Sequence, residues 1–175
     1  WSFYSFLPDH TGNVGMFSMA NEPSLHIPYL YNYAGQPWMT QKRIRTLLNQ
    51  WFRNDLMGMP GDEDGGGMSA FVVFSMMGFY PVTPGSPTYN MGSPVFTRMK
   101  VDMGNDNVFE IVADEASDRN KYIQSAQLNG VLLNQPWFTH EQIASGGLLK
   151  VKMGAKANKE WGVSNPPPSE APWKE

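Results

Sequence analysis

Three consecutive carboxylates enclosed by glycines constrain the fold of this chain more than any other feature. Asp62-Glu63-Asp64 lies between a Pro-Gly turn and three glycines, and an almost wholly apolar run over 70–80 follows at once. Like charges this close raise one another's pKa unless a cation or hydrogen-bond donors stabilise them. Glycine permits positive φ and the close approach of a ligand to the backbone. The stretch predicts an acidic loop that leads into a helix, capped by Ser69 or a residue just before it.

A purely structural interpretation of this stretch has equal weight when the stretch is taken alone. Acidic side chains are favoured near helix N-termini, so the loop could simply cap a buried helix. A calcium loop of the EF-hand type is excluded, because an apolar residue occupies the position that should carry the bidentate Glu.

Length, composition and charge exclude several classes of protein. The 175 residues suffice for one domain with a sizeable core. The net charge is -3, and the 13 Lys and Arg residues are scattered without a basic stripe, which argues against nucleic-acid binding. No apolar run approaches the roughly 20 residues of a membrane span. The absence of cysteine excludes disulfides and thiol chemistry.

The first half of the chain is expected to be helical. Asn21-Glu22-Pro23 suits the start of a helix that runs to Tyr33 and stops at Gly35. Pro28, five residues after Pro23, is expected to kink this helix or restart its first turn. A second helix is expected from Pro37 to about Asn54, because apolar residues recur there at helical spacing. A third, from Ser69 to Gly78 or Tyr80, is apolar on every side and therefore expected to be buried within a larger helical assembly.

After residue 80, frequent prolines and glycines divide the chain into short pieces. Segments follow in which apolar and polar residues alternate, as is typical of strands. The expected strands cover 96–102, 108–113, 122–128 and 148–153, with a hairpin at Asn129-Gly130 and a short helical turn over 140–144. We therefore expect a helical part over 1–80, an antiparallel β-rich part over 81–161, and an extended or disordered tail over 162–175.

In several of these segments the sequence resembles glycoside hydrolase family 92, the calcium-dependent exo-acting α-mannosidases. The matching stretches are NEPSLHIPYLYNYAGQPW at 21–38, GDEDGGGMSA at 61–70, GFYP at 78–81, YIQS at 122–125 and LNG at 128–130. They occur in the family's order and cover roughly residues 21 to 162.

The resemblance implies a fold and an activity. Family members have an N-terminal β-sandwich followed by an (α/α)6 barrel, so this chain resembles the last barrel helices followed by a small antiparallel β unit. Its partner would be the remainder of the same enzyme. The implied activity is inverting hydrolysis of terminal α-mannosidic bonds, with α-1,2 as the default linkage, in N-glycans or mannans.

The resemblance also implies roles for individual residues. The general base falls on Asp64 and its companion carboxylate on Asp62. Asn21 and Glu22 are expected to contribute to a Ca²⁺ site or to sugar hydroxyls. His26 lies four residues after Glu22, on the same face of the expected helix, and could therefore contact substrate, although a buried structural histidine is as well supported.

The family's general acid, a glutamate, has no match in this chain. Residues 1–10 weakly resemble the aromatic segment that follows that glutamate, so the acid is expected a few residues before Trp1. The stretch from Thr11 to Ala20 is shorter than its counterpart in the family. Either residues are missing there or the N-terminal match is false.

The resemblance to this family also implies a secreted, periplasmic or bacterial cell-surface location. Two alternatives to a mannosidase stay open. One is a carbohydrate-binding or structural module without activity, and the other is an (α/α)6 glycosidase with a different sugar specificity.

Overall fold

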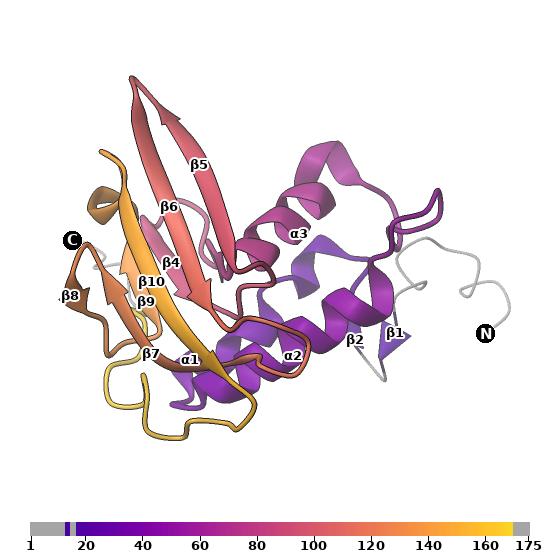
Figure 1. The fold of residues 1–175 in the computed structure, drawn as a ribbon. Coiled ribbons are helices and arrows are strands. Elements are labelled where there is room, and N and C mark those ends of the chain that lie inside the picture. The colour runs from indigo at the N-terminus through magenta and orange to yellow at the C-terminus, as the bar shows by residue number, and fades with distance from the viewer. Residues whose placement is uncertain (1–12, 15–16, 170–175) are drawn as a thin grey trace, which may run out of the picture.

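The computed structural model describes residues 13–14 and 17–169, in a helical part and a β part that lie side by side (Figure 1). The segment 1–10, on which the position of the general acid was argued, lies outside the described residues. The helical part holds β1 (Asn13–Val14), β2 (Phe17–Ser18), η3 (Glu22–Ser24), η4 (Ile27–Tyr29), α1 (Leu30–Tyr33), α2 (Pro37–Trp51), η5 (Asp64–Gly66) and α3 (Gly67–Met77).

The helix expected over 21–33 is not continuous, and the restart expected at Pro28 is confirmed. The chain instead forms two 3-10 turns, η3 and η4, before the one-turn helix α1. Each 3-10 turn has a proline in its first positions, Pro23 and Pro28. Proline lacks the N–H that a continuous α-helix requires, so Pro28 interrupts the helix and a new turn begins around it.

The other two helices are confirmed, with shifted ends. Helix α2 buries its apolar stripe and ends at Trp51, three residues earlier than expected. Helix α3 begins at Gly67 and ends where Gly78 adopts φ 97°, a left-handed C-cap. Val73 of α3 is 57% exposed in this chain, so the expected burial of α3 within a larger helical assembly stays a prediction.

The β part contains two sheets. A three-stranded sheet has the order β3-β4-β9, and a five-stranded sheet has the order β5-β6-β10-β7-β8. The strands are β3 (Phe79–Tyr80), β4 (Thr88–Met91), β5 (Arg98–Gly104), β6 (Asn107–Asp114), β7 (Tyr122–Leu128), β8 (Val131–Leu132), β9 (Trp137–Thr139) and β10 (Gly147–Gly154), with the helical turn η6 (His140–Gln142) before β10.

The expectation of a wholly antiparallel unit is wrong at one strand pair. β10 pairs with β7 in antiparallel fashion on one side, but with β6 in parallel on the other. The intervening chain lets β10 enter the sheet between β6 and β7 rather than at an edge. Alternation of apolar residues fixes which face of a strand is buried, whereas it does not specify the direction of the neighbouring strand. The β7–β8 hairpin at Asn129-Gly130 is confirmed.

Two apolar cores correspond to the two parts. The β core is formed by alternate residues of the long strands, and includes Phe109, Ile111, Ile123, Leu149 and Val151, with Phe79 and Phe138 from the smaller sheet. The helical core includes Met19, Leu25, Tyr29, Ile44, Leu48, Met68 and Phe71. Burial of this apolar surface is the main stabilising term in each part.

Buried polar side chains connect the two parts. Arg45 of α2 and Asn32 of α1 are at most 1% exposed, and both reach across to backbone carbonyls in the β part. The bonds run from Arg45 Nη1 to Pro94 O (2.8 Å), from Arg45 Nη2 to Ser117 O (2.8 Å) and from Asn32 Nδ2 to Met91 O (2.9 Å). In the reverse direction, the Ile123 N–H donates to Gln41 Oε1 (3.0 Å). Because buried polar groups must be paired, these bonds fix how the helices sit against the sheets.

Residues 162–169 form no helix or strand, yet they pack on the β part. Pro167 is buried, and Asn165 O accepts a hydrogen bond from Trp137 Nε1 (3.2 Å). Within the described residues, no helix is both long and apolar enough to cross a bilayer.

Candidate active site

The acidic loop (residues 60–66) has an unusual backbone. Asp64, Gly65 and Gly66 have φ values of 52°, 65° and 103°, so three successive residues lie in the left-handed region. Asp tolerates this region better than most residues, and such outliers gather at functional sites. The bend presents the exposed side chains of Asp62 and Asp64 immediately before α3.

Glu63, between the two candidate catalytic residues, caps the helix. Its Oε2 accepts from the Gly66 N–H (2.6 Å) and its Oε1 from the Ser69 N–H (3.2 Å). Hydrogen bonding from Ser69 and then from Gly66 holds the pKa of Glu63 below its usual range. The N-cap position of α3 is Gly66, just before Ser69 as predicted. The capping side chain is that of Glu63 instead, because its carboxylate reaches forward over the tight bend to the free N–H groups. Of the three acidic residues, Glu63 is the one engaged in the fold.

The segment that carries Asn21 and Glu22 lies against the acidic loop. A β-carbon on Gly67 would be 3.3 Å from Glu22 Cγ, and one on Gly61 would be 2.5 Å from Ala20 O. Both ends of the loop thus touch residues 20–22, and Glu22 Oε1 is shielded from solvent. The structure places Glu22 against the end of the loop that carries Asp62 and Asp64, two stretches forty residues apart that the resemblance assigned to one site; the roles of these residues stay predictions.

Tyr80 is close enough to Glu22 to be affected by its charge, and the sequence did not identify it as a candidate site residue. Burial, and then the negative charge of Glu22, raise the pKa of Tyr80. Its ring stacks on that of Tyr29, with centroids 5.4 Å apart. The GFYP stretch was the available signal, but nothing in it indicated that the tyrosine would lie near Glu22. A neutral phenol near that carboxylate can orient it or a ligand through its hydroxyl.

His26 is half-buried and lies between η3 and η4. The argument for a shared face with Glu22 assumed an α-helix over both residues, and the 3-10 turns remove that assumption. A substrate role for His26 stays a prediction. His140 lies in the β part, with its Nδ1 3.0 Å from the Tyr89 hydroxyl.

The Ca²⁺ site expected at Asn21 and Glu22 stays a prediction. No group of three or more His, Cys, Asp or Glu side chains could hold a metal ion within residues 13–14 and 17–169. Ca²⁺ takes six to eight oxygen ligands. Asn21 and Glu22 could contribute side-chain oxygens to such a site.

An apolar hollow lies apart from the carboxylates. It has a volume of about 300 Å³ and is lined by residues of β2, η4 and α2, among them Phe17, Ile27, Tyr31 and Leu47. Its wall contains no candidate catalytic group. The chemistry therefore points to the acidic loop rather than to this hollow.

Two neighbouring carboxylates on a constrained loop, with a third acidic residue packed beside them, are groups that a glycoside hydrolase uses to activate water. Comparison with known families agrees with this class. The profile of the glycosyl hydrolase family 92 catalytic domain matches residues 3–155, so the chain belongs to that family.

Individual relatives support the same assignment. The chain is similar to a family 92 α-mannosidase of Bacteroides thetaiotaomicron solved with mannoimidazole, at 38% identity and a TM-score of 0.89, over 92% of this chain and 21% of that one. A family 92 inverting mannosidase of the same organism matches at 37% identity and a TM-score of 0.80, over 86% of this chain and 20% of that one. A secreted glycosidase of Arthroderma benhamiae, otherwise uncharacterised, is 34% identical over 92% of this chain and 21% of its own length. The chain thus spans about a fifth of the relatives that it matches.

Proposed function

We propose that this chain is part of an exo-acting α-mannosidase and supplies the general base of an inverting hydrolysis. Family membership supports the class of reaction, since structural relatives are named as α-mannosidases and one as an inverting mannosidase. The observation that carries the proposal is the packing of Glu22 against Gly67, three residues after Asp64. This contact joins the two stretches from which the base and the sugar or metal ligands were predicted.

In the proposed reaction, Asp64 accepts a proton from a water molecule as the water attacks the anomeric carbon. The bond to the leaving oxygen breaks on the opposite face, and that oxygen takes a proton from an acid contributed elsewhere. Asp62 lies two residues away on the same loop and would help to orient Asp64 or the attacking water. Glu63, already bound to backbone N–H groups, is the poorer candidate for the base.

Asn21, Glu22 and His26 are assigned to recognition. Glu22 and His26 would contact sugar hydroxyls, while Asn21 and Glu22 would donate oxygens to Ca²⁺. When bound, the cation would polarise and position hydroxyl oxygens of the sugar. Tyr80, whose pKa responds to Glu22, would help to hold that carboxylate in place.

The proposed substrate is a mannose-terminated N-glycan or mannan, and α-1,2 is the first linkage to assay. Secretion is supported by a relative that is named as a secreted glycosidase. A periplasmic or cell-surface location is a further proposal within that class.

The deciding experiment compares Asp64→Asn with Glu63→Gln in the full-length enzyme. Asp64→Asn should abolish turnover of an α-mannoside, whereas Glu63→Gln, which keeps an acceptor for the cap, should retain most of it. NMR of the first product should show β-mannose, the inverted anomer. Unchanged turnover in Asp64→Asn would reject the assigned base, and full-length protein without hydrolysis of any α-mannoside would favour a non-catalytic module.

A further inference from the structure

Leu56 and Met57 form an apolar tip on the loop between α2 and the acidic loop. Their side chains are 104% and 80% exposed, and Leu56 is the most exposed large apolar residue in the described part of the chain. In Figure 1 the loop extends beyond the ends of α2 and α3, away from the sheets. Exposing two large apolar side chains at one point is costly in water, unless another surface covers them.

The loop that presents this tip is tightly held by hydrogen bonds. Arg53 Nε binds Asp55 Oδ2 (2.9 Å), and the Met57 N–H donates to Asp55 Oδ1 (2.9 Å). The Arg53 N–H donates to Gly58 O (2.8 Å), and a β-carbon on Gly58 would lie 1.8 Å from Arg53 O. Only glycine fits at position 58. The tip is therefore presented in a defined conformation rather than left on a loose loop.

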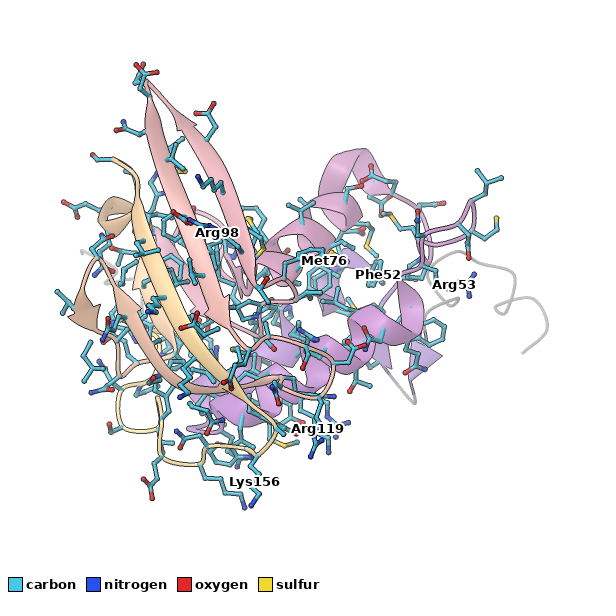
Figure 2. All side chains as sticks on the ribbon, in the orientation of Figure 1. Phe52, Arg53, Met76, Arg98, Arg119 and Lys156 are labelled. Atoms are coloured by element: carbon cyan, nitrogen blue, oxygen red, sulfur yellow. The ribbon has the colours of Figure 1, made fainter. Side chains whose placement is uncertain are left out.

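A hollow of about 330 Å³ lies beside the tip, lined by the loop and by Phe52, Met59, Val72 and Met76. Figure 2 shows Phe52 and Met76 on the side of the loop nearer the sheets, with Arg53 farther out. A projecting apolar tip next to an apolar hollow has the shape of one half of an interlocking protein contact.

We propose that the apolar tip docks on the remainder of the same polypeptide, the portion that family relatives have beyond the fifth of their length matched here. The side chains favour protein over sugar as the occupant, because Leu and Met offer neither a ring face nor a hydrogen-bonding group to a hydroxyl. Met59 and Pro60 follow the tip loop and lead into the acidic loop. Docking would therefore also fix the position of the carboxylates.

The test uses oxidation of methionine by peroxide in the full-length enzyme, followed by mass spectrometry of peptides. Among the described methionines only Met57 is exposed, whereas Met99 and Met103 of β5 are half-buried. Oxidation follows exposure, so the chain alone predicts that Met57 reacts first. The docking proposal predicts the reverse, with Met57 several-fold slower than Met99 and Met103 once each rate is divided by its rate in denaturant. Rapid oxidation of Met57 in the native enzyme would overturn the proposal.

Two further measurements identify what covers the apolar tip. Protection that disappears on dilution would assign a second copy of the enzyme and would also overturn the proposal. The variant Leu56→Ser/Met57→Ser should lower the thermal midpoint of the full-length enzyme. The matched variant Val131→Ser/Leu132→Ser, at exposed positions of β8, should not. None of these readouts requires catalysis, so they stay informative if the proposed activity is absent.

Discussion

The hydroxyl of Tyr29 lies 3.0 Å from the hydroxyl of Ser75, and both residues are fully buried. This hydrogen bond joins η4, which follows the Asn21-Glu22 segment, to α3, which begins at the acidic loop. The two halves of the candidate site are thus fastened to each other beneath the surface. Removing one hydroxyl of this buried pair is costly, because the other hydroxyl is then left without a hydrogen-bond partner in an apolar environment.

Tyr29→Phe is expected to lower the free energy of unfolding of the helical part by about 1–2 kcal/mol, because the Ser75 hydroxyl loses its partner. Adding Ser75→Ala should cost less than the sum of the two single changes, since no unpaired hydroxyl then remains. Denaturant midpoints of the four proteins measure this coupling. Simple additivity would contradict a role for the bond in joining η4 to α3.

Two alanine variants distinguish the effect of a new side-chain contact from the effect of backbone strain. They are Gly67→Ala and Gly65→Ala. Gly67 has the helical φ of -60°, so Ala adds no strain there, but its β-carbon would press on Glu22 Cγ at 3.3 Å. Gly65 has φ 65° with open space around it, so Ala costs about 1 kcal/mol of strain without a new contact. We expect Gly67→Ala to keep its thermal stability and lose activity on α-mannosides. Full activity in that variant would show that the position of Glu22 is not critical.

The depressed pKa of Glu63 predicts a pH-dependent contribution to stability. A carboxyl with a folded-state pKa below its unfolded value of about 4.5 contributes stability above that value and loses it as pH falls through the folded pKa. Glu63→Gln should therefore lower the thermal midpoint near neutral pH. The difference from the parent enzyme should shrink as pH falls below about 4.5. A difference independent of pH would show that the charge does not matter to the cap.

Calcium dependence tests the recognition half of the site. Chelation should abolish activity of the full-length enzyme, and added Ca²⁺ should restore it. Asn21→Ala and Glu22→Gln should each raise the Ca²⁺ concentration needed for half-maximal activity, because each removes or weakens an oxygen ligand. Glu141→Gln, at an exposed carboxylate of η6, is the matched control and should change nothing. Activity indifferent to chelator would remove calcium from the proposal.

Much of the fold follows from patterns that act over short distances. Helix α2 was predictable from its apolar spacing, and the β7–β8 hairpin from Asn129-Gly130, whose φ values of 52° and 80° suit a tight turn. The break at Pro28 was predictable from the missing N–H of proline, whereas the 3-10 geometry of the turns around Pro23 and Pro28 was not. The parallel partner of β10 was missed, since strand direction depends on the path of the whole chain.

The same distinction between short-range patterns and the packing of the whole chain applies to the candidate site. The motif around Asp62 and Asp64 identified the loop, and the resemblance linked it to Asn21 and Glu22. Glu63 as the cap and Tyr80 beside Glu22 depend on how the chain bends and packs, which local sequence does not specify. The positive φ of Asp64 could be anticipated only in part, from the glycines after it.

Arg45 gives the sharpest contrast between a buried charge and its exposed partner. Its side chain is 1% exposed and that of Asp118 is 87% exposed, although the two form an ion pair of 3.2 Å. Burial lowers the pKa of Arg45, and Asp118 only partly opposes that effect. Arg45→Met should therefore destabilise the protein by about 3 kcal/mol, because Pro94 O and Ser117 O lose their donors between the helical and β parts. Asp118→Asn should cost less than about 1 kcal/mol, as expected of a solvent-screened pair. Denaturant unfolding of both variants distinguishes the two effects, and equal losses would mean that the ion pair, rather than the carbonyl contacts, holds the two parts together.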